Sequence, residues 1–297
     1  MIKKYLRLVK IIFEVLAVNP KILFKRIFLM LKSIFLPVFK YPSFKKINGV
    51  LFSFNFEDHS RFNIKKMIYY DMYEMGVVET LKTFLKEGDT FIDVGANIGY
   101  ITSVGASLVG KKGWVYSFEP VPEYASKLRN IAELNKEYNI VINQFALSDK
   151  SGEEKIYLSD YSNIGANTIL PGLIDKEQIR DTIFVQTRRL DEYIEKEKIE
   201  NIKVIKIDIE GFEYPVLLGL KGFFDKCRFD KLLTPPLIIC EVSPPAYKFL
   251  GYKLEDLFEY MKQFNYFPFS ILNSEKEFSI ARIKQESTVN VLFKVKK

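Results

Sequence analysis

The nine residues 91–99 (FIDVGANIG) constrain the fold of this chain more than any other part of its sequence. The apolar residues that begin this stretch are typical of a buried parallel strand. Gly95 and Gly99 allow the backbone to turn sharply and to approach a ligand closely, because neither residue carries a Cβ. A helix-compatible run, residues 100–109, follows at once. Open α/β sheets bind nucleotide-like ligands at such strand-to-helix junctions.

The same alternation of apolar runs and helical patterns recurs along the chain. It predicts a doubly wound α/β sheet that is mostly parallel, with an antiparallel strand near the C-terminus. Strands are expected at residues 51–56, 91–94, 114–118, 140–145, 155–158, 183–187, 204–211, 237–242, 267–271 and 289–295. Helices are expected at residues 74–85, 100–109, 190–196 and 254–264, with another that begins near residue 122.

The chain is long enough for one large sheet with additions. It has 297 residues, of which 48% are hydrophobic. We predict a basic amphipathic helical extension over residues 1–46 and one α/β domain over residues 47–297. Residues 152–190 interrupt the alternation with two short strands around a polar segment. They are expected to form an insertion that serves as a lid.

Residues 1–46 carry most of the positive charge. They contain eleven Lys or Arg and one acid, Glu14, whereas the rest of the chain contains 33 basic and 36 acidic residues. No uninterrupted apolar span approaches the roughly 20 residues that a transmembrane helix needs. A signal peptide does not fit, because Glu14 interrupts the apolar stretch and no small-residue cleavage site follows. Two helices, broken near Pro20 and stopped before Pro37, fit the pattern.

Two interpretations of this extension are open. As a basic amphipathic foot, it would bind an anionic surface at the inner face of the membrane and bring the protein to a lipid-linked substrate. As a helical cap, it would pack on the domain or on a partner chain. No nucleic-acid recognition module follows in the sequence, so a nucleic acid is not expected as a partner.

Cysteine and histidine usage narrows the chemistry further. Cys227 and Cys240 lack metal-type spacing and fit a reducing cytoplasm. The one histidine, His59, cannot build a multi-histidine metal site, so a zinc site is not expected. If the chain is an enzyme, it works with carboxylates, lysines, tyrosines and backbone groups.

The acids near the glycine turn indicate which ligand the turn binds. Glu119 follows Gly99 by twenty residues, where a carboxylate can accept two hydrogen bonds from a ribose diol. The glycine spacing departs from the G-x-G-x-x-G of dinucleotide sites, and the phosphate-loop sequence G-x-x-x-x-G-K-[ST] is absent. Asp93 would repel a pyrophosphate, whereas the ammonium and sulfonium groups of S-adenosyl-L-methionine favour nearby negative charge.

Four motifs together resemble the FkbM-type S-adenosylmethionine-dependent methyltransferases. They are residues 91–99 (FIDVGANIG), 117–120 (SFEP), 145–149 (FALSD) and 206–213 (KIDIEGFE), with weaker support from residues 189–193 (RLDEY) and 239–241 (ICE). The resemblance covers roughly residues 74–270 and leaves residues 1–46 outside. It implies a Rossmann-like methyltransferase sheet with S-adenosyl-L-methionine as cofactor.

The resemblance also implies which residues bind the cofactor. They are Asp93, Gly95, Asn97, Gly99, Glu119, Ala146 and Asp149. The two glycines and Asn97 would line the methionine portion, and Asp93 would fix that loop or bind the amino group. Glu119 would hold the ribose, and the segment from Ala146 to Asp149 would border the adenine.

The acids at the end of the strand predicted over residues 204–211 are the candidates for catalysis. Methyl transfer needs the acceptor in line with the methyl group, and a hydroxyl acceptor also benefits from a general base. Asp208 and Glu210 are expected to act as that base, to orient the acceptor or to hold a divalent cation, which the sequence does not require. They would share one direction only if the strand continued through both. Glu213 and Glu241 are weaker candidates, and some of these acids could instead cap the following helix. Lys206 is expected to pair with an acid.

The sequence therefore predicts S-adenosylmethionine-dependent O-methylation of a hydroxyl on a sugar, a glycan or a related small molecule. The insertion and the N-terminal extension are expected to set specificity. The alternatives are N-methylation, an NAD(P)-dependent oxidoreductase on a similar sheet, and an inactive scaffold recruited to membranes. The identity of the acceptor and the oligomeric state are not predicted.

Overall fold

The computed structural model describes residues 42–56, 64–160, 167–170, 172–230, 232–283 and 288–296. The extension predicted for residues 1–46 therefore lies almost wholly outside the described residues, and so does His59. Within the described ranges, no helix is both long enough and apolar enough to span a bilayer.

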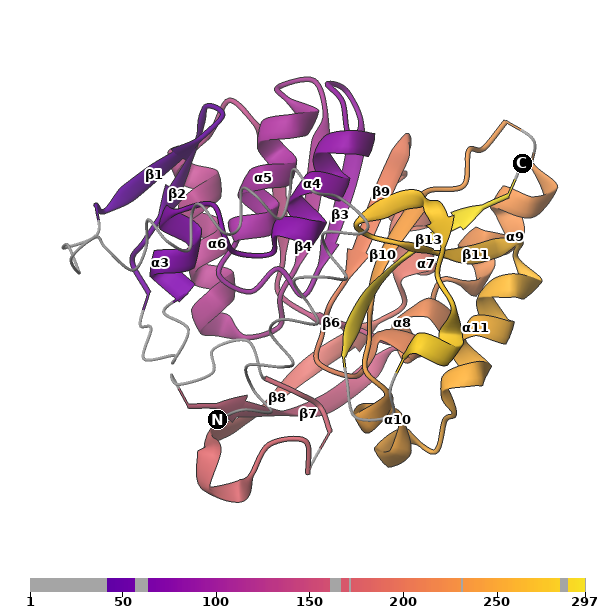
Figure 1. Ribbon diagram of the computed structural model, residues 1–297. Coiled ribbons are helices and arrows are strands. Elements are labelled where there is room, and N and C mark those ends of the chain that lie inside the picture. Colours follow the sequence, from indigo (N-terminus) through magenta and orange to yellow (C-terminus); the bar gives the residue numbers. More distant parts are fainter. Residues whose placement is uncertain are drawn as a thin grey trace, which may run out of the picture.

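Eight strands form the central sheet, in the order β12-β11-β13-β10-β9-β3-β4-β5 (Figure 1). Their bounds are β3 (Thr90–Val94), β4 (Trp114–Phe118), β5 (Asn139–Asn143), β9 (Ile202–Ile207), β10 (Leu237–Val242), β11 (Tyr266–Ser270), β12 (Asn273–Glu277) and β13 (Val289–Val295). The five neighbours from β10 to β5 run parallel, and β13 pairs antiparallel with both β10 and β11. The predicted mostly parallel sheet with an antiparallel strand near the C-terminus is confirmed.

Helices cover both faces of this sheet. They are α3 (Ile64–Tyr69), α4 (Met75–Phe84), α5 (Tyr100–Val109), α6 (Pro122–Leu134), α7 (Leu190–Lys196), α8 (Glu213–Leu218), α9 (Lys221–Phe229), α10 (Pro244–Leu250) and α11 (Leu254–Gln263). Alternate strand residues enter two separate cores: Phe91 packs with α4, α5 and α6, whereas Ile92 packs with α7, α8 and α11. This is the doubly wound arrangement that strands buried on both faces require.

A short hairpin precedes the sheet and covers α5 and α6. It consists of β1 (Phe44–Ile47) and β2 (Val50–Ser53). The strand predicted at residues 51–56 thus ends earlier, at Ser53. Its three alternating aromatic residues, Phe52, Phe54 and Phe56, are nevertheless buried together, at 0%, 5% and 6% exposure.

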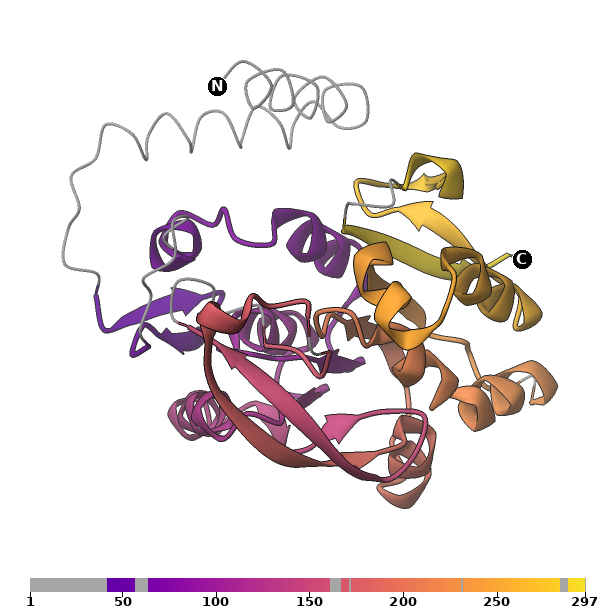
Figure 2. The ribbon, with the colours of Figure 1, turned by 90° about the horizontal axis from the view of Figure 1, so that it is seen from below.

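The insertion at residues 152–190 contains a long antiparallel hairpin. Strands β7 (Gly152–Ser159) and β8 (Ile179–Arg188) pair along their length, and β6 (Ala146–Leu147) adds to β8 in parallel. A short 3₁₀ turn at Lys176–Gln178 precedes β8, and a second lies at Ile280–Arg282. The hairpin lies across the lower end of the molecule in Figure 1 and comes to the front in Figure 2.

Two strands of the central sheet, β5 and β9, end two or more residues earlier than the sequence predicts. β5 was predicted to reach residue 145 but ends at Asn143. The Oδ1 of Asn143 accepts a hydrogen bond from the Tyr193 hydroxyl at 2.7 Å. Phe145 then turns away to pack against Tyr193. β9 was predicted over residues 204–211 but ends at Ile207. Glu210, at φ +54°, and Gly211, at φ +104°, leave the extended conformation, so the acids lie on a loop.

Candidate functional site

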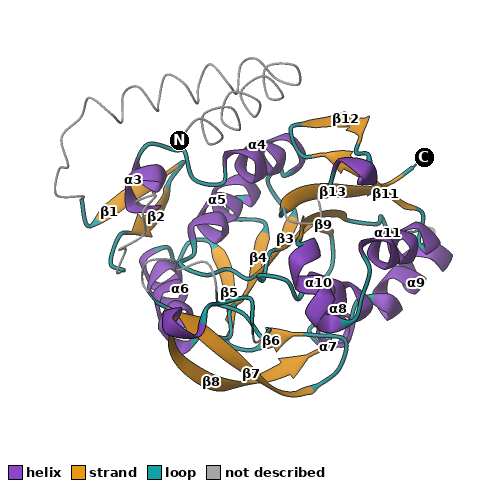
Figure 3. Cartoon of the chain, turned by 60° about the horizontal axis from the view of Figure 1, so that its bottom comes forward, coloured by secondary structure: helices purple, strands orange, loops and turns teal. Residues whose placement is uncertain are grey.

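Two adjoining cavities lie at the carboxyl ends of β3, β4 and β9, where open α/β sheets bind ligands. Figure 3 shows these strands together with the hairpin of β7 and β8. Cavity A is bounded by the loops after these strands, by β6 and by the hairpin insertion; its residues include Glu119, Phe145, Ile156 and Thr168. Cavity B is bounded by the start of α4, the β3–α5 loop and the ends of β9 and β10. Gly95, Asn97, Asp208 and Glu210 line both cavities.

The glycine turn after β3 packs directly on the end of β9. Gly95 has φ +77°, and a Cβ there would collide with the carbonyl oxygen of Asp208. Asn97 also adopts a left-handed conformation, at φ +48°. Gly99, at φ +84°, packs against Leu128 and Ile131 of α6 rather than lining either cavity. The turn therefore presents Gly95 and Asn97 to the cavities.

Asp93 lies beneath this turn, with no exposed surface. Its Oδ2 accepts a hydrogen bond from Thr102 at 2.7 Å, and its Oδ1 lies 3.6 Å from the Lys206 ammonium. Burial raises the pKa of Asp93, while Lys206 and Thr102 oppose the rise. Asp93 lines neither cavity, and its carboxylate reaches the turn through Lys206, which donates a hydrogen bond to the Gly95 carbonyl. The two predicted roles of Asp93 stay predictions.

Glu119 follows β4 and faces cavity A while bracing the turn. Its Oε2 accepts a hydrogen bond from the Asn97 amide at 2.8 Å, and its Oε1 accepts one from the Val121 amide at 2.9 Å. Burial raises the pKa of Glu119 to about 7, although these two backbone donors favour the ionised form. A carboxylate oxygen has room for a further hydrogen bond, so Glu119 can also receive hydroxyl donors from a ligand.

The segment predicted to border the adenine, residues 146–149, lines cavity A only in its first part. Ala146 lines cavity A between Phe145 and Leu147. Asp149 lies outside both cavities, where its Oδ1 accepts a hydrogen bond from the Ser148 hydroxyl and its carbonyl accepts one from Arg189. The apolar wall offered by Phe145, Ala146 and Leu147 suits a flat aromatic ring.

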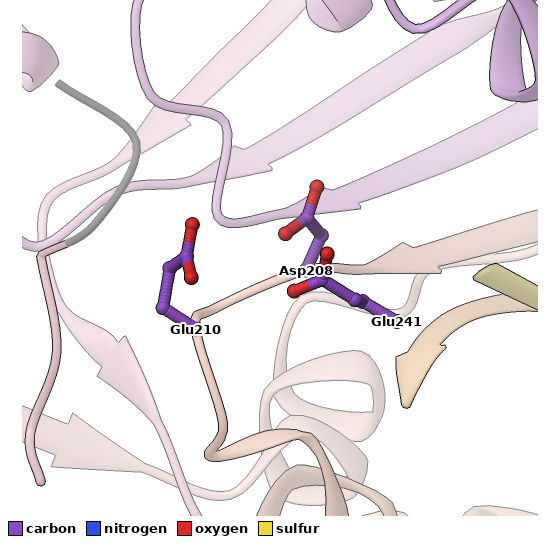
Figure 4. A group of neighbouring side chains, drawn as sticks. All are labelled: Asp208, Glu210 and Glu241. Carbon is purple, nitrogen blue, oxygen red and sulfur yellow. The ribbon is translucent and has the colours of Figure 1, made fainter. Parts of the chain in front are cut away.

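Asp208, Glu210 and Glu241 converge in Figure 4, although the strand does not continue through the first two. Each offers one carboxylate oxygen, and these three oxygens all lie within 4.8 Å of one another. β9 ends at Ile207, before both Asp208 and Glu210, and Glu210 has a left-handed backbone at φ +54°, so strand alternation does not set the direction of their side chains. We predicted that Asp208 and Glu210 would share one direction only if the strand continued through both. That prediction was wrong, because a loop brings the two acids together.

Crowding changes the proton affinity of these acids. The pKa of Glu210 and that of Glu241 are both raised. Burial is the largest cause, and the negative charge of Asp208 is the next. Glu241 Oε2 is buried and has no hydrogen-bond partner among the described residues. Raised carboxyl pKa values in a cleft are a feature of functional sites.

Lys206 links the acids to the glycine turn. It is 4% exposed, and its ammonium donates a hydrogen bond to the Gly95 carbonyl at 3.1 Å and lies 3.3 Å from Asp208 Oδ2. Burial would lower the pKa of Lys206, but Asp208 and Asp93 outweigh that effect and raise it. The predicted pairing of Lys206 with an acid is confirmed.

Glu213 has a structural place in the same region. It is fully buried in the first turn of α8, and its Oε1 accepts hydrogen bonds from the amides of Ile209 and Gly211 at 3.0 and 2.9 Å. Burial raises its pKa, which these backbone donors oppose. Glu213 thus holds the loop that carries Glu210.

Several residues that line the cavities were not predicted from the sequence as site residues. Tyr73 and Glu74 reach cavity B from the start of α4, and Tyr124 reaches cavity A from α6. The insertion contributes Thr168, whose hydroxyl donates a hydrogen bond to the Glu210 carbonyl at 2.9 Å. None of these positions carries a motif, so only their three-dimensional placement identifies them.

Comparison with known proteins shows which proteins this chain resembles. A family model described as the methyltransferase FkbM domain matches residues 93–268, more than half of the chain. The hexuronic acid methyltransferase AglP of Haloferax volcanii is 26% identical over 156 residues, which cover 52% of this chain and 60% of that protein. The 2-O-methyltransferase NoeI of Sinorhizobium fredii is 28% identical over 155 residues, which cover 48% and 62%. The chain spans about three fifths of the length of these two relatives.

Other relatives are named protein-L-isoaspartate O-methyltransferases. One from Archaeoglobus fulgidus is 30% identical over 147 residues, which cover 49% of this chain and 67% of that protein. Among solved structures, a methyltransferase FkbM from Methylobacillus flagellatus KT aligns with a TM-score of 0.40 and 12% identity, over 77% of this chain and 53% of that one.

Proposed function

The chain belongs to the FkbM family of methyltransferases, and from that premise we propose that it transfers a methyl group from S-adenosyl-L-methionine to a hydroxyl of a sugar. The printed names of two relatives, a hexuronic acid methyltransferase and a 2-O-methyltransferase, support a sugar hydroxyl as the acceptor. The same sheet can also serve N-methylation, but no relative named above supports it. The oxidoreductase alternative has no support among these relatives either.

One observation carries the proposal: cavities A and B share a wall of Gly95, Asn97, Asp208 and Glu210. Methyl transfer by in-line displacement requires a donor and an acceptor to meet at a common boundary. Cavity A has the features that the donor needs, with Glu119 for the ribose hydroxyls and an apolar wall at Ala146 for the adenine ring. Cavity B then receives the acceptor.

The residues at the shared wall have distinct roles in this proposal. When bound, S-adenosyl-L-methionine supplies an electrophilic methyl group on a sulfonium. Asp208 is paired with Lys206, so its carboxylate accepts a hydrogen bond from the acceptor hydroxyl and orients it. Glu210, whose pKa is raised, takes the proton as that hydroxyl reacts. Lys206 holds the Gly95 turn and Asp208 in one fixed geometry.

Methyl transfer and cofactor binding can be tested separately. Thermal-shift measurements at matched concentrations should show stabilisation by S-adenosyl-L-methionine and S-adenosyl-homocysteine, because a ligand that binds the native state stabilises it. Stabilisation by NAD(P) alone would contradict the proposal, and so would the absence of any shift in a folded sample. With a labelled methyl donor and a panel of sugars, Asp208→Asn should reduce turnover more than cofactor affinity. A normal turnover rate in that variant would exclude the role assigned to Asp208.

A divalent cation is a second proposal for the three converging acids. Their oxygens lie within 4.8 Å of one another, a spacing that one hard cation can bridge. Such a cation would polarise vicinal hydroxyls of the acceptor. Activity that is lost in EDTA and restored by Mg²⁺ would support it, and full activity in EDTA would exclude it.

We also propose that residues 1–46 contact an anionic membrane surface. Their eleven basic residues and one acid support this role, since basic amphipathic segments are attracted to anionic lipids. Such contact would bring the site near a lipid-linked glycan acceptor.

A further inference from the structure

Cavity B has an apolar lining as well as carboxyl groups. The carboxyl groups at the shared wall come from the loop after β9, and another comes from the end of β10. The apolar groups come from the lead-in to α4, from the β3–α5 loop and from the start of α5: Tyr73, Ile98, Tyr100 and Ile101. A sugar ring offers the matching combination, because its hydroxyls project from the edge while its C–H bonds form an apolar face. Ligand pockets commonly combine aromatic walls with a few polar groups in this way.

The hydroxyl of Tyr73 is a hydrogen-bond donor that faces this cavity. It forms no hydrogen bond with any residue that the structure describes. The hydroxyls of Tyr193 and Tyr266, in contrast, donate to partners 2.7 and 2.9 Å away, as buried tyrosines usually do. Burial, and then the charges of neighbouring acids with Glu74 first among them, raise the pKa of Tyr73 well above its usual value. The hydroxyl therefore keeps its proton and can donate it in a hydrogen bond to a ligand.

The ring of Tyr73 is held in place by aromatic neighbours. Tyr100, the first residue of α5, meets it edge to face with the ring centroids 5.7 Å apart. Tyr100 in turn contacts Phe52 of β2 edge to face at 5.8 Å, and Phe52 is fully buried. Edge-to-face contacts between aromatic rings are favourable. This row of three rings anchors Tyr73 to the core of the domain.

Lys45 of β1 fixes the backbone that precedes Tyr73. Its ammonium donates hydrogen bonds to the carbonyls of Ile68 and Tyr69, at 2.7 and 3.0 Å, and to Asp71 Oδ1 at 2.7 Å. The two carbonyls lie at the end of α3, where a helix leaves carbonyl groups without partners of its own. The backbone and the ring of Tyr73 are thus both positioned before a ligand binds, which lowers the cost of binding.

We propose that Tyr73 binds the acceptor in cavity B, with its ring packed on the C–H face of a cyclic sugar and its hydroxyl donating a hydrogen bond to an oxygen of that sugar. This inference rests on the proposed function and narrows the acceptor to a sugar ring, as opposed to an open-chain polyol. Tyr73 orients the plane of the ring, while the acids at the shared wall engage one hydroxyl. Tyr73 precedes residues 93–268, the span that the family model matches, so the lead-in to the sheet supplies this contact.

Methylation kinetics with the full-length protein test the ring contact. A labelled methyl donor and a panel of methyl hexosides identify the sugar with the highest kcat/KM, and that sugar is used for the variants. Tyr73→Met removes the aromatic face, although its thioether can still pack on Tyr100. We expect the KM for the sugar to rise about tenfold or more, while S-adenosyl-homocysteine binds as in wild type. A wild-type KM, or a loss of cofactor binding that accompanies the rise, would overturn the inference.

Tyr73→Phe separates the hydroxyl from the ring. It keeps the contact with Tyr100 and loses only the hydrogen bond to the sugar, so the KM should rise about threefold, less than in Tyr73→Met. A wild-type KM in Tyr73→Phe would contradict the hydrogen bond, and a rise as large as that in Tyr73→Met would contradict the packing of the ring.

Tyr70 provides the matched control. It lies three residues before Tyr73, lines neither cavity A nor cavity B, and its ring contacts Tyr69 with the centroids 5.1 Å apart. Tyr70→Met should keep the wild-type KM. A rise equal to that in Tyr73→Met would show that the effect is not specific to cavity B and would contradict the assignment of Tyr73.

The proposed function and this inference can fail separately. If no sugar of the panel is methylated, or if S-adenosyl-homocysteine does not bind to the wild-type protein, the proposed function is contradicted and the inference with it. If a hexoside is methylated but sorbitol, an open-chain polyol, reacts with an equal kcat/KM, the acceptor is not selected as a ring and the inference alone is wrong. We expect the kcat/KM for sorbitol to be at least about tenfold lower.

Discussion

Glu119 shows how one residue serves both the fold and the site. Its two carboxylate oxygens accept the amides of Asn97 and Val121, so it joins the turn after β3 to the turn after β4. The same side chain lines cavity A. A buried acid is retained at such a position because its removal would leave two amides without partners.

The affinity for the methyl donor should depend on this carboxylate. Glu119→Gln keeps the size of the side chain but removes the charge-assisted hydrogen bonds to the ribose. Such bonds contribute about 1.5–3 kcal/mol, so we expect affinity for S-adenosyl-L-methionine to fall by about ten- to a hundredfold in calorimetry. Glu133→Gln, at an exposed residue paired with Lys136, serves as the control. Equal affinity in Glu119→Gln and wild type would exclude a ribose contact.

Glu210 should set the acidic limb of the pH profile. Burial and the neighbouring Asp208 raise its pKa above that of an ordinary glutamate, about 4.3. The base is active when deprotonated, so kcat should rise with pH through this raised value and be lost below it. Glu210→Gln should remove the limb and lower kcat by about 10²–10⁴-fold. A limb that persists unchanged in the variant would assign it to another group.

At the scale of elements, the turn after β3 matters most for the site. Gly95 cannot be replaced by a larger residue, since a Cβ would strike the Asp208 carbonyl oxygen. The hairpin insertion reaches the same region from the opposite side, through the hydrogen bond from Thr168 to the Glu210 carbonyl. The described residues of the insertion line cavity A, the proposed donor site, and none of them lines cavity B, so the insertion acts on the proposed acceptor site through this contact with Glu210.

A pair of glycine variants separates collision from backbone strain. Gly95→Ala and Gly88→Ala both place a Cβ at positive φ, at +77° and +90°, which costs about 1–2 kcal/mol. A Cβ at Gly88 meets nothing within 4 Å, whereas one at Gly95 collides with the carbonyl oxygen of Asp208. We expect Gly95→Ala to lose cofactor binding and to unfold at lower denaturant than Gly88→Ala. Comparable stability and affinity in the two variants would show that the turn can shift.

Long, periodic elements could be predicted from the sequence, and short ones could not. The pattern gave α5 its bounds, Tyr100–Val109, because ten residues of consistent periodicity outweigh local ambiguity. A helix was expected after the acids at residues 208 and 210 but without bounds, and α10 was not predicted. Glu213–Leu218 contains Pro215, Pro244–Leu250 begins with two prolines, and both helices are too short for a clear periodic pattern. These helices are stabilised by burial of residues such as Leu217 and Tyr247 rather than by propensity.

Some residues of the candidate site could be predicted from the sequence, and others could not. Glu119 could be placed from its spacing to the glycine turn, because strand, turn and helix lengths in such sheets are regular. The approach of Glu241 to Glu210 depends on the left-handed backbone at Glu210, which no periodicity predicts. Glu74 reaches cavity B because the lead-in packs over the sheet, a tertiary contact without a local signal.

At the scale of the whole molecule, strand order determines where chemistry can occur. The sheet places β9 between β3 and β10, so the acids after β9 and Glu241 at the end of β10 lie beside the glycine turn after β3. Both faces are closed by helical cores, which leaves the carboxyl edge for ligands. The charge of the chain is divided, with basic residues at the N-terminus and acidic residues at the site.

The basic N-terminus should determine binding to lipid. Deleting residues 1–46 removes eleven basic residues and one acid, so binding to vesicles that contain anionic lipid should fall sharply, and more so at low ionic strength. Cosedimentation measures this directly, with neutral vesicles as the control and cofactor binding as the test of folding. Equal partitioning of the truncated and full-length chains would contradict the membrane proposal.

A crystal structure of the protein with S-adenosyl-homocysteine would show whether cavity A holds the methyl donor. We expect the ribose within hydrogen-bond distance of Glu119, the adenine against the wall at Ala146, and the sulfur facing Asp208 and cavity B. A ligand bound elsewhere, or turned so that its sulfur faces away from cavity B, would contradict it.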